Sequence, residues 1–405
     1  MERYDQWIKK IETLSSLLQN QPLFVLSLSS KELFHSNFWK WLITVGEHQV
    51  LSIFELDSLN YKGRITPERE KYKIDLTIET NSEPDNVAYI ENKVKSIPNL
   101  QQLNRYNKDL NNKKNKKLKD YRLITLFEPL PYIRHEINGQ GIWKIISYLE
   151  LAKSLEKVNL KNRYHQKLLK DYRIVIKCLS ELSNALINSP NRKKLDIVRD
   201  SNMPLKILGE IGLDDIYIKY RSNEITHYLY DLFLKIRDKL IKRYPDDPFW
   251  QVTVEYEYTK SDKYYLDKKE NWIKNLPDDC ILIDWGYNNK NGTLDFSLKI
   301  TDEILMGIQI EGGQYRKFIY CQKNCTKYAE AIIKNTKDVW FDKTWKSKKK
   351  REQFLKYDST FRYQYDYSNH LTKETTNREI AKRILLDLKS LFDHRQVIRD
   401  AILKL

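Results

Sequence analysis

Two short apolar segments joined by a turn constrain the fold of this chain more than any other feature. Residues 72–80 (YKIDLTIET) alternate apolar and polar side chains, as a strand with one buried face does. Residues 81–86 (NSEPDN) are turn formers, and residues 87–93 (VAYIENK) form a second strand-like segment. The pattern predicts a β-hairpin with its turn near residue 83 or 84.

The flanking segments predict a mixed α/β domain around this hairpin. Helices are expected at residues 3–19, from about residue 30, and at 98–110, with strands at 63–70 and 121–129. Residues 141–188 are expected to be helical. The second helix carries an apolar stripe at helical spacing, formed by Leu33, Phe34, Phe38, Trp41 and Leu42.

A chain of 405 residues exceeds one compact core, so two domains are expected. We place them at residues 1–190, with a helical extension, and 191–405, an α+β domain with antiparallel strands. In the second, a helix at about 224–244 precedes strands near 249–258, 281–288, 293–300 and 304–313. Asn291-Gly292 marks a hairpin, and Thr376 with Glu379 forms a capping box that starts a final helix.

Charge and composition limit the kinds of partner that this chain can have. A formal net charge of +16 predicts a polyanionic partner such as nucleic acid, or else a Lys-rich surface without such a role. No apolar run is long enough to span a membrane, and the first residues lack a secretory pattern, so we expect a cytoplasmic protein without a membrane partner. The 4 cysteines form no C-x-x-C pair and are expected to be reduced.

Glu91-Asn92-Lys93 is the single E-x-K sequence of the chain. Alternation along a strand places Glu91 and Lys93 on one face. A second carboxylate comes from Asp85, which forms a literal Pro-Asp, or from Asp75. Asp85 lies in the turn, about 20 Å from Glu91 at the rise of a strand, so Asp75 is the candidate, provided that the strand register brings it opposite residues 91–93.

Two carboxylates and an ammonium in this arrangement fit phosphodiester hydrolysis. Neighbouring carboxylates repel each other unless a cation lies between them, and Mg²⁺ accepts carboxylate, water and phosphate oxygens as ligands. Such a metal activates water, and a lysine neutralises the charge that develops on the phosphate. The alternative is a surface salt bridge between Glu91 and Lys93, with Asp75 solvated.

The ordered set of motifs resembles the PD-(D/E)XK nuclease superfamily, and a bacterial branch of it in particular. The matching segments, over roughly residues 25–185, are ELFHSNFWKWLI, KIDLTIET, AYIENK, QLNRY, GIWKIISYLEL and KLLKDYRIVI. The resemblance implies a restriction-endonuclease-like fold, in which helices flank a mixed β-sheet. The C-terminal half carries no such resemblance.

The resemblance also implies roles for individual residues. Asp75 and Glu91 would be ligands of Mg²⁺ or Mn²⁺, together with the backbone carbonyl of Asn92, and Lys93 would be the catalytic lysine. Glu32 would support a metal-bound water or a second metal. Its alternative role is a capping box with Ser29.

Residues beyond the E-x-K complete the predicted site. Gln102 and Tyr106 lie four apart on one helix face and could reach the scissile phosphate or Lys93, although Tyr106 could equally belong to the core. Arg105, on a neighbouring face, could contact phosphate. The lysine cluster is about 20 Å from Lys93 along the helix and is either a phosphate contact or a solvated loop. Its members are Lys113, Lys114, Lys116, Lys117 and Lys119.

These residues predict a metal-dependent nuclease that hydrolyses DNA phosphodiester bonds. A role in bacterial anti-phage defence would use the C-terminal domain as a sensor or as a site for nucleic acid or a protein partner. Cutting both strands would favour a homodimer. The alternative is a catalytically inactive nuclease-fold protein that binds nucleic acid or a protein.

Overall fold

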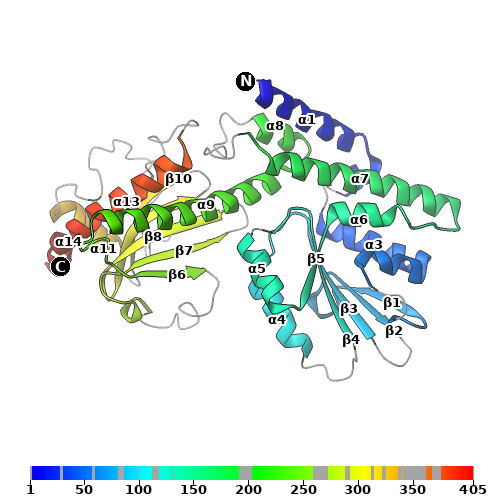
Figure 1. Ribbon diagram of the computed structural model, residues 1–405, viewed down its shortest axis with the longest axis horizontal. Helices are drawn as coiled ribbons and strands as arrows, with labels where there is room; N and C mark the ends of the chain where they lie inside the picture. The colour runs from blue at the N-terminus through cyan, green and yellow to red at the C-terminus, as the bar shows by residue number, and fades with distance from the viewer. Residues whose placement is uncertain are drawn as a thin grey trace. The chain divides into compact units, whose positions relative to one another are not determined.

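The computed structural model (Figure 1) divides into two compact units. The first contains residues 1–190 and 202–220, and the second contains residues 191–201 and 221–405. The structure describes residues 2–27, 31–56, 60–80, 86–98, 100–111, 118–129, 131–190, 203–258, 272–287, 292–311, 314–321, 325–335, 340, 362–366 and 375–404.

A mixed sheet with strand order β1-β2-β3-β4-β5 forms the centre of the first unit. Its strands are β1 (Ile65–Arg69), β2 (Leu76–Thr80), β3 (Asn86–Lys93), β4 (Leu118–Thr125) and β5 (Trp143–Ser147). The first three pair antiparallel, whereas β3, β4 and β5 run parallel. The predicted hairpin and the predicted mixed sheet are both confirmed.

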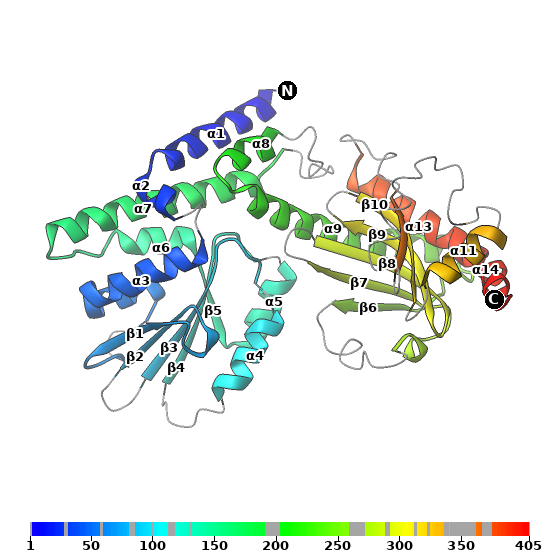
Figure 2. The same ribbon diagram turned by 180° about the vertical axis from the view of Figure 1, so that it is seen from behind.

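Helices cover both faces of this sheet. One layer contains α4 (Leu100–Asn111) and α5 (Pro131–Gln140). The other contains α1 (Glu2–Gln19), α3 (Glu32–Gly46), α6 (Tyr148–Leu155) and α7 (Arg163–Ile187). Figure 2 shows α3, α6 and α7 together, across the sheet from α4 and α5. Shorter helical segments in this unit are α2 (Pro22–Leu26), η1 (Glu47–Phe54), η3 (Lys71–Lys73) and α8 (Met203–Glu210).

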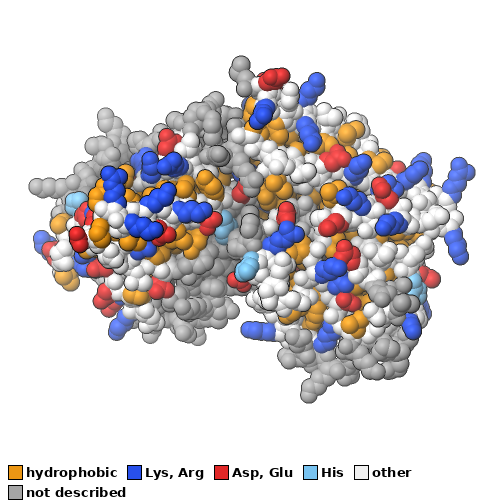
Figure 3. All heavy atoms as spheres, in the orientation of Figure 1, with side chains coloured by type: hydrophobic (Ala, Val, Ile, Leu, Met, Phe, Trp, Pro, Cys, Tyr) orange, Lys and Arg blue, Asp and Glu red, His pale blue; other side chains and the backbone are white. Residues whose placement is uncertain are grey.

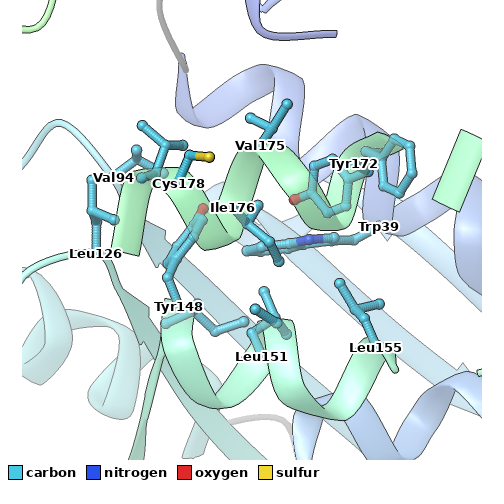
Figure 4. Close-up of a cluster of buried hydrophobic side chains, with 14 of the residues drawn as sticks. Trp39, Val94, Leu126, Tyr148, Leu151, Leu155, Tyr172, Val175, Ile176 and Cys178 are labelled. Carbon is cyan, nitrogen blue, oxygen red and sulfur yellow. The ribbon is translucent and has the colours of Figure 1, made fainter. Parts of the chain in front are cut away.

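Strand β3 is buried along its whole length because both of its faces are covered. Val87 and Tyr89 pack in the core beneath α4, whereas Ala88 and Ile90 pack in the larger core on the opposite face. Figure 4 shows part of that larger core. Strands covered on both faces are usually apolar throughout, so charged side chains at the end of β3 require a specific environment.

Strand β5 corrects the expectation that residues 141–188 are helical throughout. Residues 143–147 pair with β4 in parallel register. Trp143 and Ile146 are buried against opposite faces of the sheet, which is the alternation of a strand. The helix α6 begins immediately afterwards, with Ser147 and Glu150 forming its capping box. Pairing with β4 therefore outweighs the helical periodicity of this segment.

The buried face of α3 also differs from the predicted stripe. Phe38 and Leu42 are buried as expected, but Leu33 is 51% exposed. His35 and Trp39 are fully buried in its place. The helix is rotated relative to the predicted stripe because these rings fill the space beside Tyr148 and Tyr172, where aromatic contacts surround His35.

The second unit contains a six-stranded sheet of order β11-β10-β9-β8-β7-β6. Its strands are β6 (Val254–Tyr258), β7 (Ile281–Tyr287), β8 (Gly292–Thr301), β9 (Ile304–Glu311), β10 (Gln314–Cys321) and β11 (Arg362–Asp366). Strands β7 to β11 pair antiparallel, which confirms the predicted α+β character. The sequence analysis identified neither β10 nor β11. Asn291, of the predicted Asn291-Gly292 hairpin, lies outside the described residues.

The helices of the second unit pack on this sheet. They are α11 (Cys325–Asn335), α13 (Asn377–Asp393) and α14 (Arg395–Leu403), together with the short η5 (Trp272–Asn275). Helix α9 (Asp214–Arg243) contributes residues up to Tyr220 to the first unit and its remainder to the second. The predicted capping box of Thr376 and Glu379 is present at the start of α13.

On the face shown in Figure 3, Lys and Arg side chains of the first unit are interspersed with Asp and Glu, so the positive charge is not gathered in one patch there. Among the described residues, none of the helices combines the length and the apolar composition needed to cross a membrane.

Candidate active site at the end of strand β3

The register of the β2–β3 hairpin brings Asp75 next to Glu91. Leu76 pairs with Ile90, and the antiparallel ladder continues away from the site toward the turn. Extending this register by one residue places Asp75, the residue before β2, across from Glu91. Glu79 pairs with Val87, which is the register that the sequence predicted, and the turn residues 81–85 lie outside the described residues. Asp85, the rejected alternative, lies outside the described residues.

Glu91 and Lys93 lie on the same face of β3, as the alternation of the strand predicted. The ammonium Nζ of Lys93 is 2.7 Å from Glu91 Oε1, and both side chains are buried. The alternative of a solvated surface salt bridge is therefore wrong. A buried charge pair at a strand end is costly to desolvate, so it needs a structural or functional reason.

Helix α4 supplies polar contacts to Glu91. Gln102 Nε2 donates to Glu91 Oε1 at 2.9 Å and also contacts the hydroxyl of Tyr106 at 2.6 Å. That hydroxyl donates to the main-chain carbonyl of Lys73 at 2.7 Å. Gln102 and Tyr106 thus share a helix face as predicted. The ring of Tyr106 is buried in the core beneath α4, and its hydroxyl orients Gln102.

Asn92 holds the other carboxylate through its main chain. Its N–H donates to Asp75 Oδ2 at 2.7 Å. Its side chain points to the opposite face of the sheet, where Asn92 Oδ1 accepts from Tyr148 Oη at 2.8 Å and Asn92 Nδ2 donates to the carbonyl of Glu32 at 3.3 Å. The position of Asp75 is thereby linked to helices α3 and α6.

Glu32 binds the turn that follows Lys93. Its Oε1 accepts from the main-chain N–H groups of Val94, Lys95 and Ser96, each at 3.1 Å, and from the Ser96 hydroxyl at 2.6 Å. Helix α3 begins at Glu32 itself, with Lys31 in the N-cap position. The capping-box alternative for Glu32 is therefore wrong, because its carboxylate bonds to residues more than 60 positions away along the chain.

Burial controls the ionisation of the charged groups. Desolvation raises the pKa of Glu91 to about 7; Lys93 opposes this shift, and Asp75 adds to it. Desolvation also raises the pKa of Asp75, against the hydrogen bond from Asn92. Burial alone would lower the pKa of Lys93, but the surrounding carboxylates, Glu91 foremost, raise it above its usual value. The site has an excess of negative charge that a bound cation would relieve.

The oxygen atoms of the site fit a hard divalent cation. Glu91 Oε2 is buried and has no hydrogen-bond partner among the described residues. In that same part of the chain, no group of three or more His, Cys, Asp or Glu side chains is placed to hold a metal. Asp75 and Glu91 would therefore need main-chain, water or substrate oxygens as further ligands. Mg²⁺ and Mn²⁺ accept such a set, because they favour oxygen ligands and Mg²⁺ retains several waters.

The remaining predicted contacts lie farther from this centre. Arg105 is exposed on α4, and its guanidinium lies 5.6 Å from the ring centroid of Tyr106. Lys119 Nζ donates to the carbonyl of Leu110 at 2.7 Å. The other four lysines of the cluster, Lys113, Lys114, Lys116 and Lys117, lie outside the described residues.

Tyr148 and Ser96 are site residues that the sequence analysis missed. Tyr148 begins the helix after β5, and the Ser147-x-x-Glu150 capping box was a usable signal for that boundary. Ser96 carried no signal, because its partner Glu32 is distant along the chain.

Comparison with known proteins agrees with this geometry. Residues 55–173 match the family model of the PD-(D/E)XK nuclease superfamily. This segment of the chain is similar to that superfamily, as its motifs predicted, and the similarity suggests a nuclease. The matched segment includes Asp75, Glu91, Lys93 and Gln102 but neither Glu32 nor the second unit. No curated protein and no solved structure matches the chain.

Proposed function

We propose that this protein is a metal-dependent nuclease that hydrolyses DNA phosphodiester bonds. The observation that carries the proposal is the grouping of Asp75, Glu91 and Lys93 at the end of β3. Lys93 Nζ lies 2.7 Å from Glu91 Oε1, and Asn92, the residue between them, donates its N–H to Asp75 Oδ2 at 2.7 Å. A chain that used this fold only as a scaffold would have no need to keep these charges buried together.

The metal ligands in this proposal are Asp75, Glu91 and the main-chain carbonyl of Asn92. A bound Mg²⁺ or Mn²⁺ would lower the pKa of water and stabilise negative charge on the phosphate. Gln102 holds Oε1 of Glu91 and leaves Oε2 of the same carboxylate without another partner among the described residues. Asn92 fixes Asp75 by the hydrogen bond from its N–H.

Lys93 supplies the positive charge of the reaction. Its ammonium remains protonated at neutral pH, because the neighbouring carboxylates raise its pKa. It therefore acts by orienting the attacking water and by neutralising the charge that develops on the phosphate, in place of acting as a general base.

The substrate proposal rests on charge. A formal net charge of +16 favours a polyanion. The exposed Arg105 and the lysines of the cluster 113–117 are the proposed contacts to the nucleic-acid backbone. Because the described part of the chain holds one such catalytic group, cleavage of both DNA strands would use a homodimer.

The test is a cleavage assay with purified protein on three substrates. They are a supercoiled plasmid, a single-stranded DNA and an RNA of the same length as that DNA. Each substrate is incubated with Mg²⁺, with Mn²⁺ and with chelator. We expect DNA cleavage that requires the metal and is lost in Asp75→Asn. Cleavage of RNA alone would correct the substrate, and DNA binding without cleavage under any condition would favour the inactive, nucleic-acid-binding alternative.

A role in bacterial anti-phage defence extends this proposal. The second unit, which lies outside the matched family segment, would act in the cytoplasm as a sensor or as a binding site for nucleic acid or a protein. Phage plating on cells that express the wild type or Asp75→Asn tests this role. Equal plating on both strains, for every phage tried, would count against it.

A further inference from the structure

Glu32 contacts the chain on both sides of Lys93. Its main-chain carbonyl accepts from the side chain of Asn92 at 3.3 Å, immediately before Lys93. Its carboxylate oxygen Oε1 accepts from Val94, Lys95 and Ser96, immediately after it. A single residue at the start of α3 therefore brackets the lysine of the site.

The main chain of Lys93 has one further anchor. Its carbonyl accepts from the N–H of Leu126, the residue after β4, at 3.0 Å. Beyond that point the chain leaves the sheet, and residues 94–96 form a bend without ladder hydrogen bonds. Three successive N–H groups need an acceptor when they are partly buried. In this bend the carboxylate of Glu32 is that acceptor. Without Glu32, the bend that follows Lys93 would lose the acceptor that fixes its conformation.

We propose that Glu32 is a positioning residue, which fixes Lys93 and Asn92 through the main chain and thereby fixes Asp75. This inference rests on the proposed nuclease function. It assigns Glu32 a role different from support of a metal-bound water or of a second metal. Those roles require Glu32 to offer a negative charge to the metal, whereas a positioning role requires an acceptor oxygen at the right distance from three N–H groups.

The two roles respond differently to conservative substitutions. Glu32→Gln keeps the chain length and one acceptor oxygen but removes the charge. Glu32→Asp keeps the charge but shortens the side chain by one methylene, about 1.5 Å, so hydrogen bonds of 3.1 Å can no longer form without a shift of the main chain. Glu32→Ala removes both properties. Glu136→Ala, at an exposed glutamate on α5, is the matched control for the loss of one carboxylate.

The first measurement is the affinity of the apo protein for Mn²⁺ by isothermal titration calorimetry, alongside the rate of DNA cleavage. We expect Glu32→Gln to remain within about threefold of the wild type. Glu32→Asp and Glu32→Ala should lose about 10- to 100-fold in Mn²⁺ affinity, the range for removing a partner that orients metal ligands. The reverse order, with Asp tolerated and Gln as damaging as Ala, would overturn the positioning role.

The second measurement is hydrogen exchange of the Val94, Lys95 and Ser96 amides, which needs neither metal nor activity. We expect these amides to stay protected in Glu32→Gln and to exchange faster in Glu32→Asp and Glu32→Ala. If the wild type neither binds Mn²⁺ nor cleaves DNA, the proposed function fails, and the exchange data still decide the contact. Unchanged protection in Glu32→Ala would overturn the inference on its own. Circular dichroism of each variant identifies one that fails to fold, and Glu32→Gln then remains the decisive comparison.

Discussion

The ammonium of Lys93 lies 2.7 Å from Oε1 of Glu91, and the two side chains are only 8% and 3% exposed. Each charge compensates the other in a place where neither could be solvated. The pair is the centre of the proposed chemistry, and the coupling between its two charges can be measured without substrate.

Removal of one member of this pair should destabilise the fold more than removal of both. We expect Lys93→Met or Glu91→Gln to lower the free energy of unfolding by roughly 3 kcal/mol at pH 8, because a buried charge is left without its partner. The double variant Lys93→Met/Glu91→Gln should lose less than either single variant. Urea denaturation in chelator measures this double-mutant cycle, and strictly additive losses would contradict the coupling.

The hydroxyl of Tyr148 should contribute to stability through Asn92. Tyr148→Phe removes the donor to Asn92 Oδ1, so a buried carbonyl oxygen loses a partner, at a cost of about 1–3 kcal/mol in the free energy of unfolding. Tyr164→Phe is the matched control, because Tyr164 is 71% exposed on α7. Thermal denaturation compares the two variants. An equal effect at both positions would show that the Tyr148 contact is unimportant.

His35 should make the fold sensitive to acid. Burial lowers its pKa from 6.5 to about 3, so the folded protein holds it neutral, and its contribution to stability is present above pH 6.5 and lost as the pH falls toward 3. From pH 7 to pH 5, this single group should remove about 2 kcal/mol from the free energy of unfolding.

The test for His35 is the change in stability with pH in a variant that cannot titrate. His35→Gln should be less stable at pH 7, because it loses packing beside Tyr172, yet its stability should fall less steeply between pH 7 and pH 5. His135→Gln, at an exposed histidine of α5, is the matched control, because it removes one histidine just as His35→Gln does. The same slope in His35→Gln as in the wild type would contradict the assignment.

Gly307 should be essential to the sheet of the second unit. A Cβ at this position of β9 would lie 1.9 Å from the carbonyl oxygen of Phe296 and 2.6 Å from Cα of Ser297. Both are backbone atoms, so the strands would have to separate, and we expect Gly307→Ala to cost about 3 kcal/mol, the upper end of the usual range for overpacking. Gly139→Ala in α5 is the control, since no atom lies within 4 Å of the added Cβ. Limited proteolysis of the two variants makes the comparison, and equal resistance would contradict it.

The hairpin of the site could be predicted because its signals are local. Alternation of apolar residues set the two strands, the turn residues set the register, and the register placed Asp75 beside Glu91. Lys93 followed from Glu91 by the two-residue period of a strand. Gln102 and Tyr106 followed from the helical period in the same way.

The remaining features depend on contacts that the local sequence does not encode. Residues 143–147 read as helix because α6 follows them without a turn, and only pairing with β4 makes them a strand. Leu33 fitted the apolar stripe of α3, but the rings around His35 set the rotation of that helix. Glu32 fitted a local capping box, yet its acceptor capacity is used by the bend after Lys93.

The most direct test of the central claim is the single-turnover rate of DNA cleavage by Lys93→Met in saturating Mg²⁺. Lys108→Met is the matched control, because Lys108 is exposed on the adjacent helix α4. We predict a loss of at least about 100-fold in the rate for Lys93→Met, as expected for a group that stabilises developing charge, and little change for Lys108→Met. Wild-type rates in both variants, or a wild-type rate that chelator leaves unchanged, would contradict a metal-dependent site at the end of β3.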